Sequence, residues 1–368
     1  MRYISILFFA FVLLAPSCKN PTEGDMLDLT TIPYNPVSVS PDIDNPLFPV
    51  LEQPSDNQMT VDGIDLGRHL FYDPILSKDL SMSCSSCHLP SGSFTDNLAL
   101  STGVDGIEGE RSSMSLLNVG FNYRGLFWDG RILTLEEQAL LPVEDPIELH
   151  AQWPDVELRL QESELYPEKF RKAFGIEDKE EITKILAAKA LAQFERSLIS
   201  SKNSKFDKAK KGEYAFTDEE RLGKEMFFDE YQGDNPEIPD AQCFHCHDQP
   251  LFTNNAYENN ALDGSLSYFD FPDLGFGEVT GVMGDNGKFR VPTLRNIEYT
   301  APYMHDGRFE TLDEVMDHYI SGGHFSPTKS AFLDSIHLDT NQKQALISFL
   351  LTLSDPEFNE NPDFSNPF

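Results

Sequence analysis

The sequence predicts a mainly α-helical protein built from two tandem domains that are related by an internal duplication. Three observations lead to this prediction. The segment Leu66–Asp73 reads LGRHLFYD and is matched by LGKEMFFD at Leu222–Asp229. A Cys-x-x-Cys-His motif follows each copy, at 84–88 and at 243–247, and Phe-Thr follows each motif. Helix-start signals recur in both halves, whereas strand signals are few.

Local signals justify each expected helix. A Thr that is followed three residues later by Glu forms a capping box, which satisfies free backbone N–H groups where a helix begins. Such boxes stand at Thr134–Glu137, Thr217–Glu220 and Thr311–Glu314. Helical spacing also predicts a long helix that closes the first domain, and its buried stripe consists of Ile182, Ile185, Leu186, Ala190, Phe194 and Leu198.

A last helix is expected from about Thr340 to Leu353, before Pro356. Its apolar residues are Ala345, Leu346, Phe349, Leu350 and Leu353. The charged, Gly-ended stretch Lys208–Gly212 is the expected boundary between the domains. The first domain then covers residues 56–212 and the second covers residues 213–368.

The two Cys-x-x-Cys-His motifs indicate covalently bound haem. In this pattern two thiols form thioethers to one haem, and the adjacent His ligates the iron. The motif residues are Cys84, Cys87 and His88 in the first domain and Cys243, Cys246 and His247 in the second. A disulfide framework and a Cys₄ zinc site are the alternatives, and both leave the two His residues unexplained. We therefore expect two cytochrome c-like domains, each with one haem c.

The N-terminus resembles an export signal. Residues 1–17 contain Arg2 and then a short apolar run that cannot span a bilayer, which is typical of a signal peptide. Cys18 follows directly and favours lipoprotein processing, with a simple secreted protein as the alternative. Residues 18–55 are rich in Pro and Asp and are expected to be a lipid-anchored tether. The prediction is an exported, periplasmic lipoprotein that contacts the membrane only through this anchor.

Composition limits the partners. The chain has 368 residues, of which 40% are hydrophobic, and this is enough for two domains with separate cores. The formal net charge of −33 makes nucleic acid and anionic membrane surfaces poor partners. An acidic surface can also steer a small basic electron carrier, although solubility explains the charge equally well.

Residues from about 60 to 353 resemble the bacterial dihaem cytochrome c peroxidases and the related MauG-type enzymes. The resemblance is carried by FWDGR at 127–131, LEEQA at 135–139, PIE at 146–148, VPTLRN at 291–296 and APYMHDG at 301–307. It implies that H₂O₂ is reduced to water at the first haem with electrons that enter through the second haem. The implied electron donor is a small c-type cytochrome or cupredoxin, and a homodimer is a further implied assembly.

The resemblance also implies roles for residues of the first haem pocket. Glu148 would be the catalytic carboxyl that moves a proton between the oxygens of peroxide, and Gln138 would be its hydrogen-bonding companion. Trp128 would lie between the haems for electron transfer. The residues alone leave three nearby carboxylates as rivals of Glu148, and these are Glu136, Glu137 and Glu144.

The second haem departs from the peroxidase pattern. The position of its Met ligand is Tyr319 here, as in the MauG-type enzymes, and a phenolate favours ferric iron. We expect Tyr319 to be the ligand, and the alternatives are Met316, His318 and His324. His305 aligns with Trp128 in the duplication and is expected to pack against the haem or to contact a propionate.

A second departure concerns the first haem. The peroxidases carry a His that blocks this iron until the other haem is reduced, but no His lies between His88 and His150. We therefore expect an open first haem that reacts without reductive activation. A Ca²⁺ ion between the domains is also implied, with Ser112 in place of the usual Asn and with the carbonyls of Thr300 and Pro302.

Two other functions stay open. A MauG-like enzyme would use peroxide to oxidise a protein substrate, but Ala241-Gln242 stand where such enzymes carry an exit Trp before the second motif. A dihaem electron-transfer cytochrome without catalysis would need both irons to be six-coordinate. The missing His and the presence of Glu148 count against that function.

Overall fold

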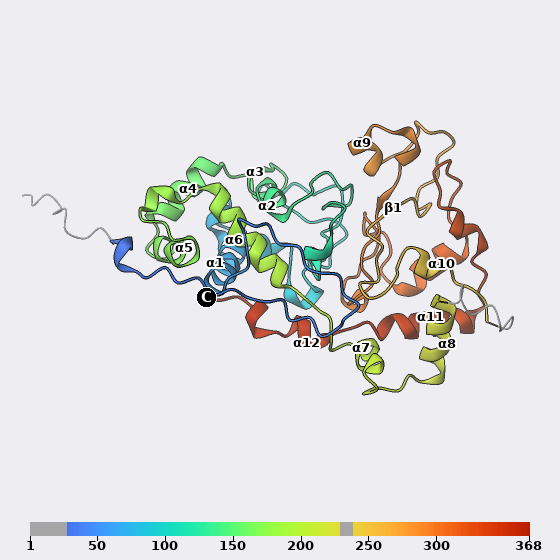
Figure 1. Cartoon of the computed structure of the whole chain (residues 1–368). Coiled ribbons are helices and arrows are strands. Elements are labelled where there is room, and N and C mark those ends of the chain that lie inside the picture. The colour runs from blue at the N-terminus through green and yellow to red at the C-terminus, as the bar shows by residue number, and fades with distance from the viewer. Residues whose placement is uncertain (1–27, 229–237) are drawn as a thin grey trace, which may run out of the picture.

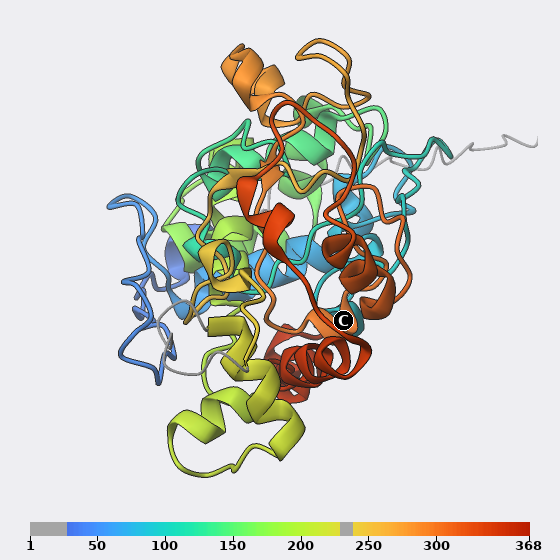
Figure 2. The same cartoon turned by 90° about the vertical axis from the view of Figure 1, so that its right-hand side faces the viewer.

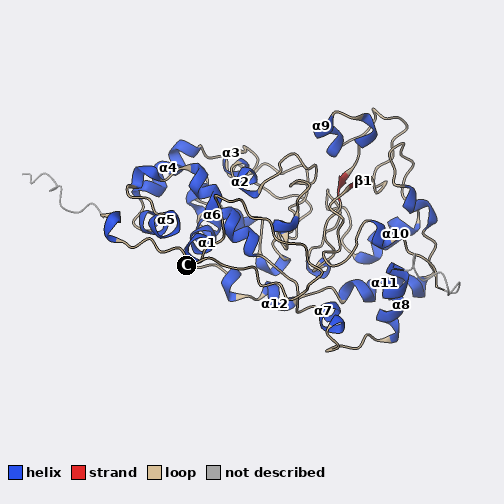
Figure 3. Ribbon diagram, in the orientation of Figure 1, coloured by secondary structure: helices blue, strands red, loops and turns tan. Residues whose placement is uncertain are grey.

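The computed structural model of the chain describes residues 28–228 and 238–368. The expected signal peptide and Cys18 lie outside these residues. Helices and loops make up nearly all of the described chain (Figure 3), and its one strand pair is β1 (Tyr257–Glu258) with antiparallel β2 (Phe289–Arg290). None of its helices is both long enough and apolar enough to cross a membrane.

The helices form two lobes (Figure 1). In chain order they are α1 (Val61–Tyr72), α2 (Leu135–Gln138), α3 (Leu141–Glu144), α4 (Trp153–Glu162), α5 (Tyr166–Phe174), α6 (Lys184–Ser197), α7 (Lys205–Lys210), α8 (Asp218–Phe228), α9 (Phe276–Thr280), α10 (Leu312–Ile320), α11 (Thr340–Leu351) and α12 (Pro356–Asn359). Helices α1 to α6 build the first lobe, and α7 to α11 lie in the second. In Figure 2 the second lobe faces the viewer, with α9 (orange) at the opposite end of the lobe from α7 and α8.

A crossed pair of helices forms the centre of each lobe. In the first lobe, α1 crosses α6 where Gly67 lies against the α6 backbone and the Cβ of Phe194. In the second lobe, α8 crosses α11 where Gly223 lies against the α11 backbone and the Cβ of Phe349. A side chain at either glycine would overlap the partner backbone, so the close crossing requires glycine.

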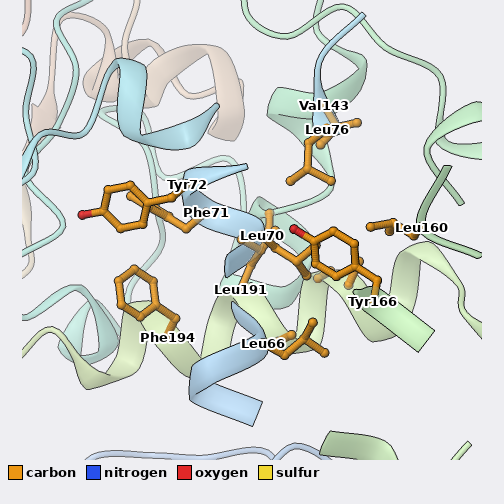
Figure 4. Close-up of a cluster of buried hydrophobic side chains, with 14 of the residues drawn as sticks. Leu66, Leu70, Phe71, Tyr72, Leu76, Val143, Leu160, Tyr166, Leu191 and Phe194 are labelled. Atoms are coloured by element: carbon orange, nitrogen blue, oxygen red, sulfur yellow. The ribbon is translucent and has the colours of Figure 1, made fainter. Parts of the chain in front are cut away.

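The first core surrounds the α1–α6 crossing (Figure 4). Leu66, Leu70 and Phe71 of α1 are fully buried there, together with Tyr166 of α5 and Phe194 of α6. Each such side chain contributes about 1.5–3 kcal/mol of burial free energy. A smaller second core packs around α8 and α11.

The three expected helix starts are confirmed. The Oγ1 of Thr311 accepts a hydrogen bond from the Glu314 backbone N–H at 3.2 Å, and the Glu314 carboxylate accepts one from the Thr311 N–H at 2.9 Å. The Oγ1 atoms of Thr134 and Thr217 likewise cap α2 and α8, each accepting a hydrogen bond at 3.2 Å from the backbone nitrogen three residues later. These contacts satisfy N–H groups that have no partner within the helix.

The expected long helix is α6, but one residue of its stripe was assigned wrongly. Ile182, Ala190, Phe194 and Leu198 are buried, whereas Ile185 is 49% exposed. Helix α6 begins at Lys184, so Ile185 lies in its first turn. The side chain of Ile185 faces solvent there. The last expected helix is α11, which ends at Leu351, and Leu353 is buried just beyond it.

Segments near the expected boundary and at the C-terminus pack against the lobe to which they were not assigned. Phe206 on α7 already packs in the second core, and buried Asp207 pairs with buried Arg295 at 2.8 Å. The C-terminal residues run back to the first lobe (Figure 1), where Phe364 joins its core and accepts a hydrogen bond from the Tyr72 hydroxyl at 2.6 Å. These contacts cross the expected boundary, and the domain ranges 56–212 and 213–368 stay a prediction.

Residues 28–55 lie against the body of the protein. Leu29, Phe48 and Leu51 are buried, and the Val39 N–H donates to the Met59 carbonyl at 2.9 Å. A free tether therefore does not describe this part of the expected segment 18–55. The segment is rich in Pro and Asp and has no helical pattern of apolar residues. Single apolar side chains can nevertheless be buried against the core.

Two candidate haem sites

Each Cys-x-x-Cys-His motif lines its own cavity. The first cavity has a volume of about 610 Å³ and the second has a volume of about 250 Å³. The first contains the thiols of Cys84 and Cys87, the second contains those of Cys243 and Cys246, and all four thiols are unpaired. Because the two pairs line different cavities, they cannot share one zinc ion. Neither a disulfide framework nor a Cys₄ site describes them.

Both motif histidines have a geometry that suits iron ligation. The Nδ1 of His88 lies 2.8 Å from the Phe94 carbonyl, and the Nδ1 of His247 lies 3.2 Å from the Phe252 carbonyl. With Nδ1 as the donor, Nε2 keeps its lone pair for a metal. Burial lowers the pKa of His88 and lowers that of His247 to about 4, so both rings are neutral at pH 7. The Phe-Thr pair after each motif thus supplies the carbonyl that orients the ligand.

Glu148 and Gln138 both line the first cavity. Gln138 ends α2, and Glu148 lies in the loop after α3, where its carbonyl accepts a hydrogen bond from the Val104 N–H at 2.8 Å. Burial, with a contribution from nearby Asp145, raises the pKa of Glu148 to about 7, while Arg131 opposes the shift. A carboxyl with this pKa both accepts and returns a proton near neutral pH.

The three rival carboxylates lie outside the cavity wall. Glu136 pairs with Arg196 at 2.7 Å, and although burial opposes ionisation, this contact and Asn57 lower the pKa of Glu136. Glu137 accepts a hydrogen bond from the Thr134 hydroxyl at 2.9 Å, and Glu144 is exposed at the end of α3. Glu148 is therefore the member of this group that the fold directs into the first cavity.

Trp128 lines both cavities, and its role between the haems stays a prediction. Its indole Nε1–H donates to the Ser112 carbonyl at 2.9 Å. Its own carbonyl accepts a hydrogen bond from the Arg290 N–H at 2.8 Å. These bonds hold the indole in the wall that the two cavities share.

Arg290 is a site residue that the sequence did not reveal. Its side chain lines both cavities, it is 5% exposed, and its Nε has no hydrogen-bond partner among the described residues. Burial lowers the pKa of Arg290 to about 10, so it is still a cation at pH 7. A buried cation beside two haem cavities suits the carboxylates that haem c carries as propionates. Arg290 directly precedes the VPTLRN motif at 291–296, and this position was the one sequence feature that could have indicated it as a site residue.

The second cavity contains both leading ligand candidates. Tyr319 and Met316 stand one turn apart on α10 and both line this cavity. Burial raises the pKa of the Tyr319 phenol to about 12. His318 instead contacts the Asn260 carbonyl through Nε2 at 2.9 Å, and neither His318 nor His324 belongs to the cavity wall.

His305 and the expected calcium residues lie where the lobes meet. The His305 ring stacks on Phe289 with centroids 3.7 Å apart, and it lines the second cavity. Ser112, Thr300 and Pro302 line the same cavity. The Ser112 hydroxyl donates to the Met304 carbonyl at 3.0 Å, which leaves its lone pairs free. The calcium site stays a prediction.

Comparison with known proteins agrees with this geometry. The sequence profile described as di-haem cytochrome c peroxidase matches residues 61–215 and 217–348. The chain belongs to the di-haem cytochrome c peroxidase family. It is therefore an oxidoreductase whose family carries two c-type haems.

The similar proteins include both peroxidases and MauG proteins. Cytochrome-c peroxidase IdrP1 of Pseudomonas sp. (strain SCT) is 32% identical over 86% of this chain and 87% of its own length. The methylamine utilization protein MauG of Methylorubrum extorquens is 32% identical over 82% and 80%. A crystal structure of a MauG-like protein associated with microbial copper homeostasis has a TM-score of 0.78 and 33% identity, covering 88% of this chain and 98% of that one.

Proposed function

We propose that the protein reduces hydrogen peroxide to water in the first cavity, with electrons that arrive through the second haem. The reaction consumes H₂O₂, two electrons and two protons and yields two water molecules. The observation that carries the proposal is Glu148, a carboxyl that lines the cavity of the first motif and has its pKa raised to about 7. A haem bound at Cys84, Cys87 and His88 supplies the iron at which the O–O bond is cleaved.

Residues of the first cavity then carry out the proton transfer. Glu148 takes a proton from the inner oxygen of peroxide and returns it to the outer oxygen, which leaves as water. Gln138 shares the cavity wall and orients peroxide or the carboxyl by hydrogen bonding. The surrounding wall, which includes Leu116 and Val143, excludes bulk water and keeps Glu148 protonatable near pH 7.

Electrons reach the first site from the second lobe. We propose that a small c-type cytochrome or cupredoxin reduces the second haem, which is held by Cys243, Cys246 and His247. The position of Trp128 in the wall of both cavities supports its role between the haems. Tyr319 is the proposed sixth ligand of the second iron. The duplication, the Ca²⁺ site, a homodimer and an exported lipoprotein anchored at Cys18 belong to the same proposal.

Stopped-flow spectroscopy of the fully oxidised, haem-loaded protein tests the proposal. The protein is mixed with H₂O₂ in the absence of reductant. A rapid change in the Soret band is expected, because no His between His88 and His150 is available to block the first iron. A reaction that starts only after one electron is added would mean that another ligand closes this haem. No reaction in either state would overturn peroxide reduction.

A second candidate function is peroxide-driven oxidation of a protein substrate. Tyr319 in the wall of the second cavity favours it, because the family resemblance places a Tyr ligand in MauG-type enzymes. The measurement is the lifetime of the peroxide-oxidised protein without a donor. A state that decays within one turnover time favours peroxidase activity. A state that persists and then disappears on addition of a candidate protein substrate favours the second function.

A further inference from the structure

Helix α6 carries a second carboxyl into the first cavity. Glu195 lines this cavity together with Cys84 and Glu148, and it is 6% exposed. Its Oε2 is buried and has no hydrogen-bond partner among the described residues. An ionised carboxylate without donors is strongly disfavoured in such a place. Neither its contacts nor the expected function accounts for this carboxyl.

The second lobe shows that the helix crossing does not require a carboxyl at this position. Glu195 follows Phe194, whose Cβ meets Gly67, whereas Leu350 follows Phe349, whose Cβ meets Gly223 in the same way. Leu350 lines the second cavity just as Glu195 lines the first. An apolar residue therefore serves the packing, and the carboxyl at 195 is specific to the first cavity.

Burial, more than the nearby charges, favours the protonated form of Glu195. Burial raises the pKa of Glu195 to about 8, Arg196 on the same helix opposes the shift and Glu136 on α2 adds to it. Arg196 itself is paired with Glu136 at 2.7 Å, so it does not neutralise Glu195 directly. The other charged or titratable groups of the cavity wall are Cys84, Cys87, His88, Glu110, Arg111, Asp129, Arg131, Asp145, Glu148, Glu278 and Arg290.

We propose that Glu195 is a redox-linked proton site of the first cavity. At a pH at which the oxidised protein holds Glu195 as a carboxylate, gain of one electron by the first haem makes this carboxylate bind one proton from solvent and become a neutral acid. When the haem is oxidised, the acid releases that proton. One electron and one proton therefore move together, and the net charge of the cavity is unchanged.

The physical reason is the cost of unbalanced charge in a buried site. An added electron is repelled by a nearby carboxylate much more strongly inside a protein than in water. Protonation of Glu195 removes this repulsion. Peroxide reduction consumes two protons for two electrons, and the carboxyls of Glu148 and Glu195 can together hold two protons.

The inference rests on a haem bound at His88, and it does not require that this haem reacts with peroxide.

Spectroelectrochemical titration of the haem-loaded protein tests the proposal without peroxide. The reduction potential of the first haem is measured from about pH 6 to about pH 10. In the unmodified protein the potential should fall as pH rises, because the reduced state binds the proton more tightly. Glu195→Gln and Glu195→Leu, the latter matching Leu350, should lose this dependence above about pH 7.

Two further variants separate Glu195 from its neighbours. Glu136→Gln should move the pH-dependent region but keep it, because the pKa of Glu136 is lowered and the carboxylate is ionised throughout this range. Glu148→Gln should keep the part of the dependence that belongs to Glu195. Unchanged pH dependence in both Glu195 variants, with normal haem content, would overturn the proposal.

Proton uptake by the unmodified protein gives an independent measurement if the Glu195 variants do not bind haem. A pH indicator should report uptake of a proton when the first haem is reduced near pH 8. Absence of uptake would also overturn the proposal. Reaction with peroxide is recorded separately on the same samples, so failure of the peroxidase proposal leaves this result interpretable.

Discussion

The proposed role of Glu148 is catalytic, and its side chain lines the first cavity. Glu148→Gln keeps the shape of the side chain and removes the titratable group. We expect normal haem content and a peroxide turnover that is lower by about 10²–10⁴-fold, the usual contribution of general acid–base catalysis. Steady-state turnover and the haem spectrum measure the two quantities. Near-normal turnover would remove Glu148 from the mechanism.

The pKa of Glu148 also predicts the pH profile of the enzyme. The group that takes the first proton from peroxide must be a carboxylate, and the pKa of about 7 makes that form minor in acid. The rate of the peroxide reaction should therefore fall as pH drops below about 7. Stopped-flow rates over pH measure this dependence. Glu148→Gln should flatten the acidic limb, and an unchanged limb would assign it to another group.

Tyr319 and Met316 can be separated by two substitutions. Axial ligands move haem potentials over a range of about 0.8 V, and loss of a phenolate ligand should raise the potential of the second haem. Tyr319→Phe should therefore change its ferric spectrum and raise its potential. Met316→Leu, one turn away on α10, should leave both close to normal. The reverse pattern would identify Met316 as the ligand.

Some site residues could be predicted from neighbouring sequence, whereas others depend on contacts between distant parts of the chain. The motif cysteines and histidines were predictable because haem attachment needs them within five residues. Glu148 was selected among its neighbours only by resemblance to a family. Arg290 and Glu195 were not selected, because a buried polar atom without a hydrogen-bond partner becomes visible only when the surrounding chain is placed.

The two helix crossings define the elements that hold the haem sites. Gly67→Ala places a methyl group where the α6 backbone lies, and Gly223→Ala does the same at α11. We expect each to lower the free energy of unfolding by about 1–3 kcal/mol, the usual cost of overpacking. Denaturant unfolding measures the change. Gly284→Ala is the matched control, since it meets open space, and an equal effect there would refute the argument.

Helix positions were predictable from the sequence where the cap and the apolar spacing agreed. Thr311 and Glu314 determine the start of α10 through two hydrogen bonds within four residues. Ile185 was assigned wrongly because spacing alone does not specify which side of the first turn faces a partner. That side is decided by where α1 crosses α6, which is a tertiary contact.

At the scale of the whole molecule, the C-terminal segment connects the second domain back to the first lobe. Phe364 is buried in the first core, whereas Phe368 is 66% exposed. Phe364→Ala should destabilise the first lobe by about 3–5 kcal/mol, as expected for loss of a buried Phe. Thermal unfolding monitored at the first haem measures this. Phe368→Ala is the control, and equal effects of the two variants would contradict the argument.

The net charge of −33 leads to a prediction about the electron donor. A basic donor should associate rapidly at low ionic strength, and its kcat/KM should fall as salt is added because screening weakens the attraction. Turnover with a basic and an acidic c-type cytochrome, measured over a range of salt concentrations, tests this. If both donors respond equally to salt, the charge serves solubility and does not steer the donor.

The sequence by itself determined the helical class, the haem motifs, the helix caps and the family, because each depends on residues close together in the chain or on a pattern that extends along most of it. The tertiary structure decided which carboxyls enter the first cavity, how the lobes exchange α7 and the C-terminal segment, and that residues 28–55 pack on the body. These features depend on burial and on contacts between residues more than a hundred positions apart, such as the Tyr72 hydroxyl and the Phe364 carbonyl.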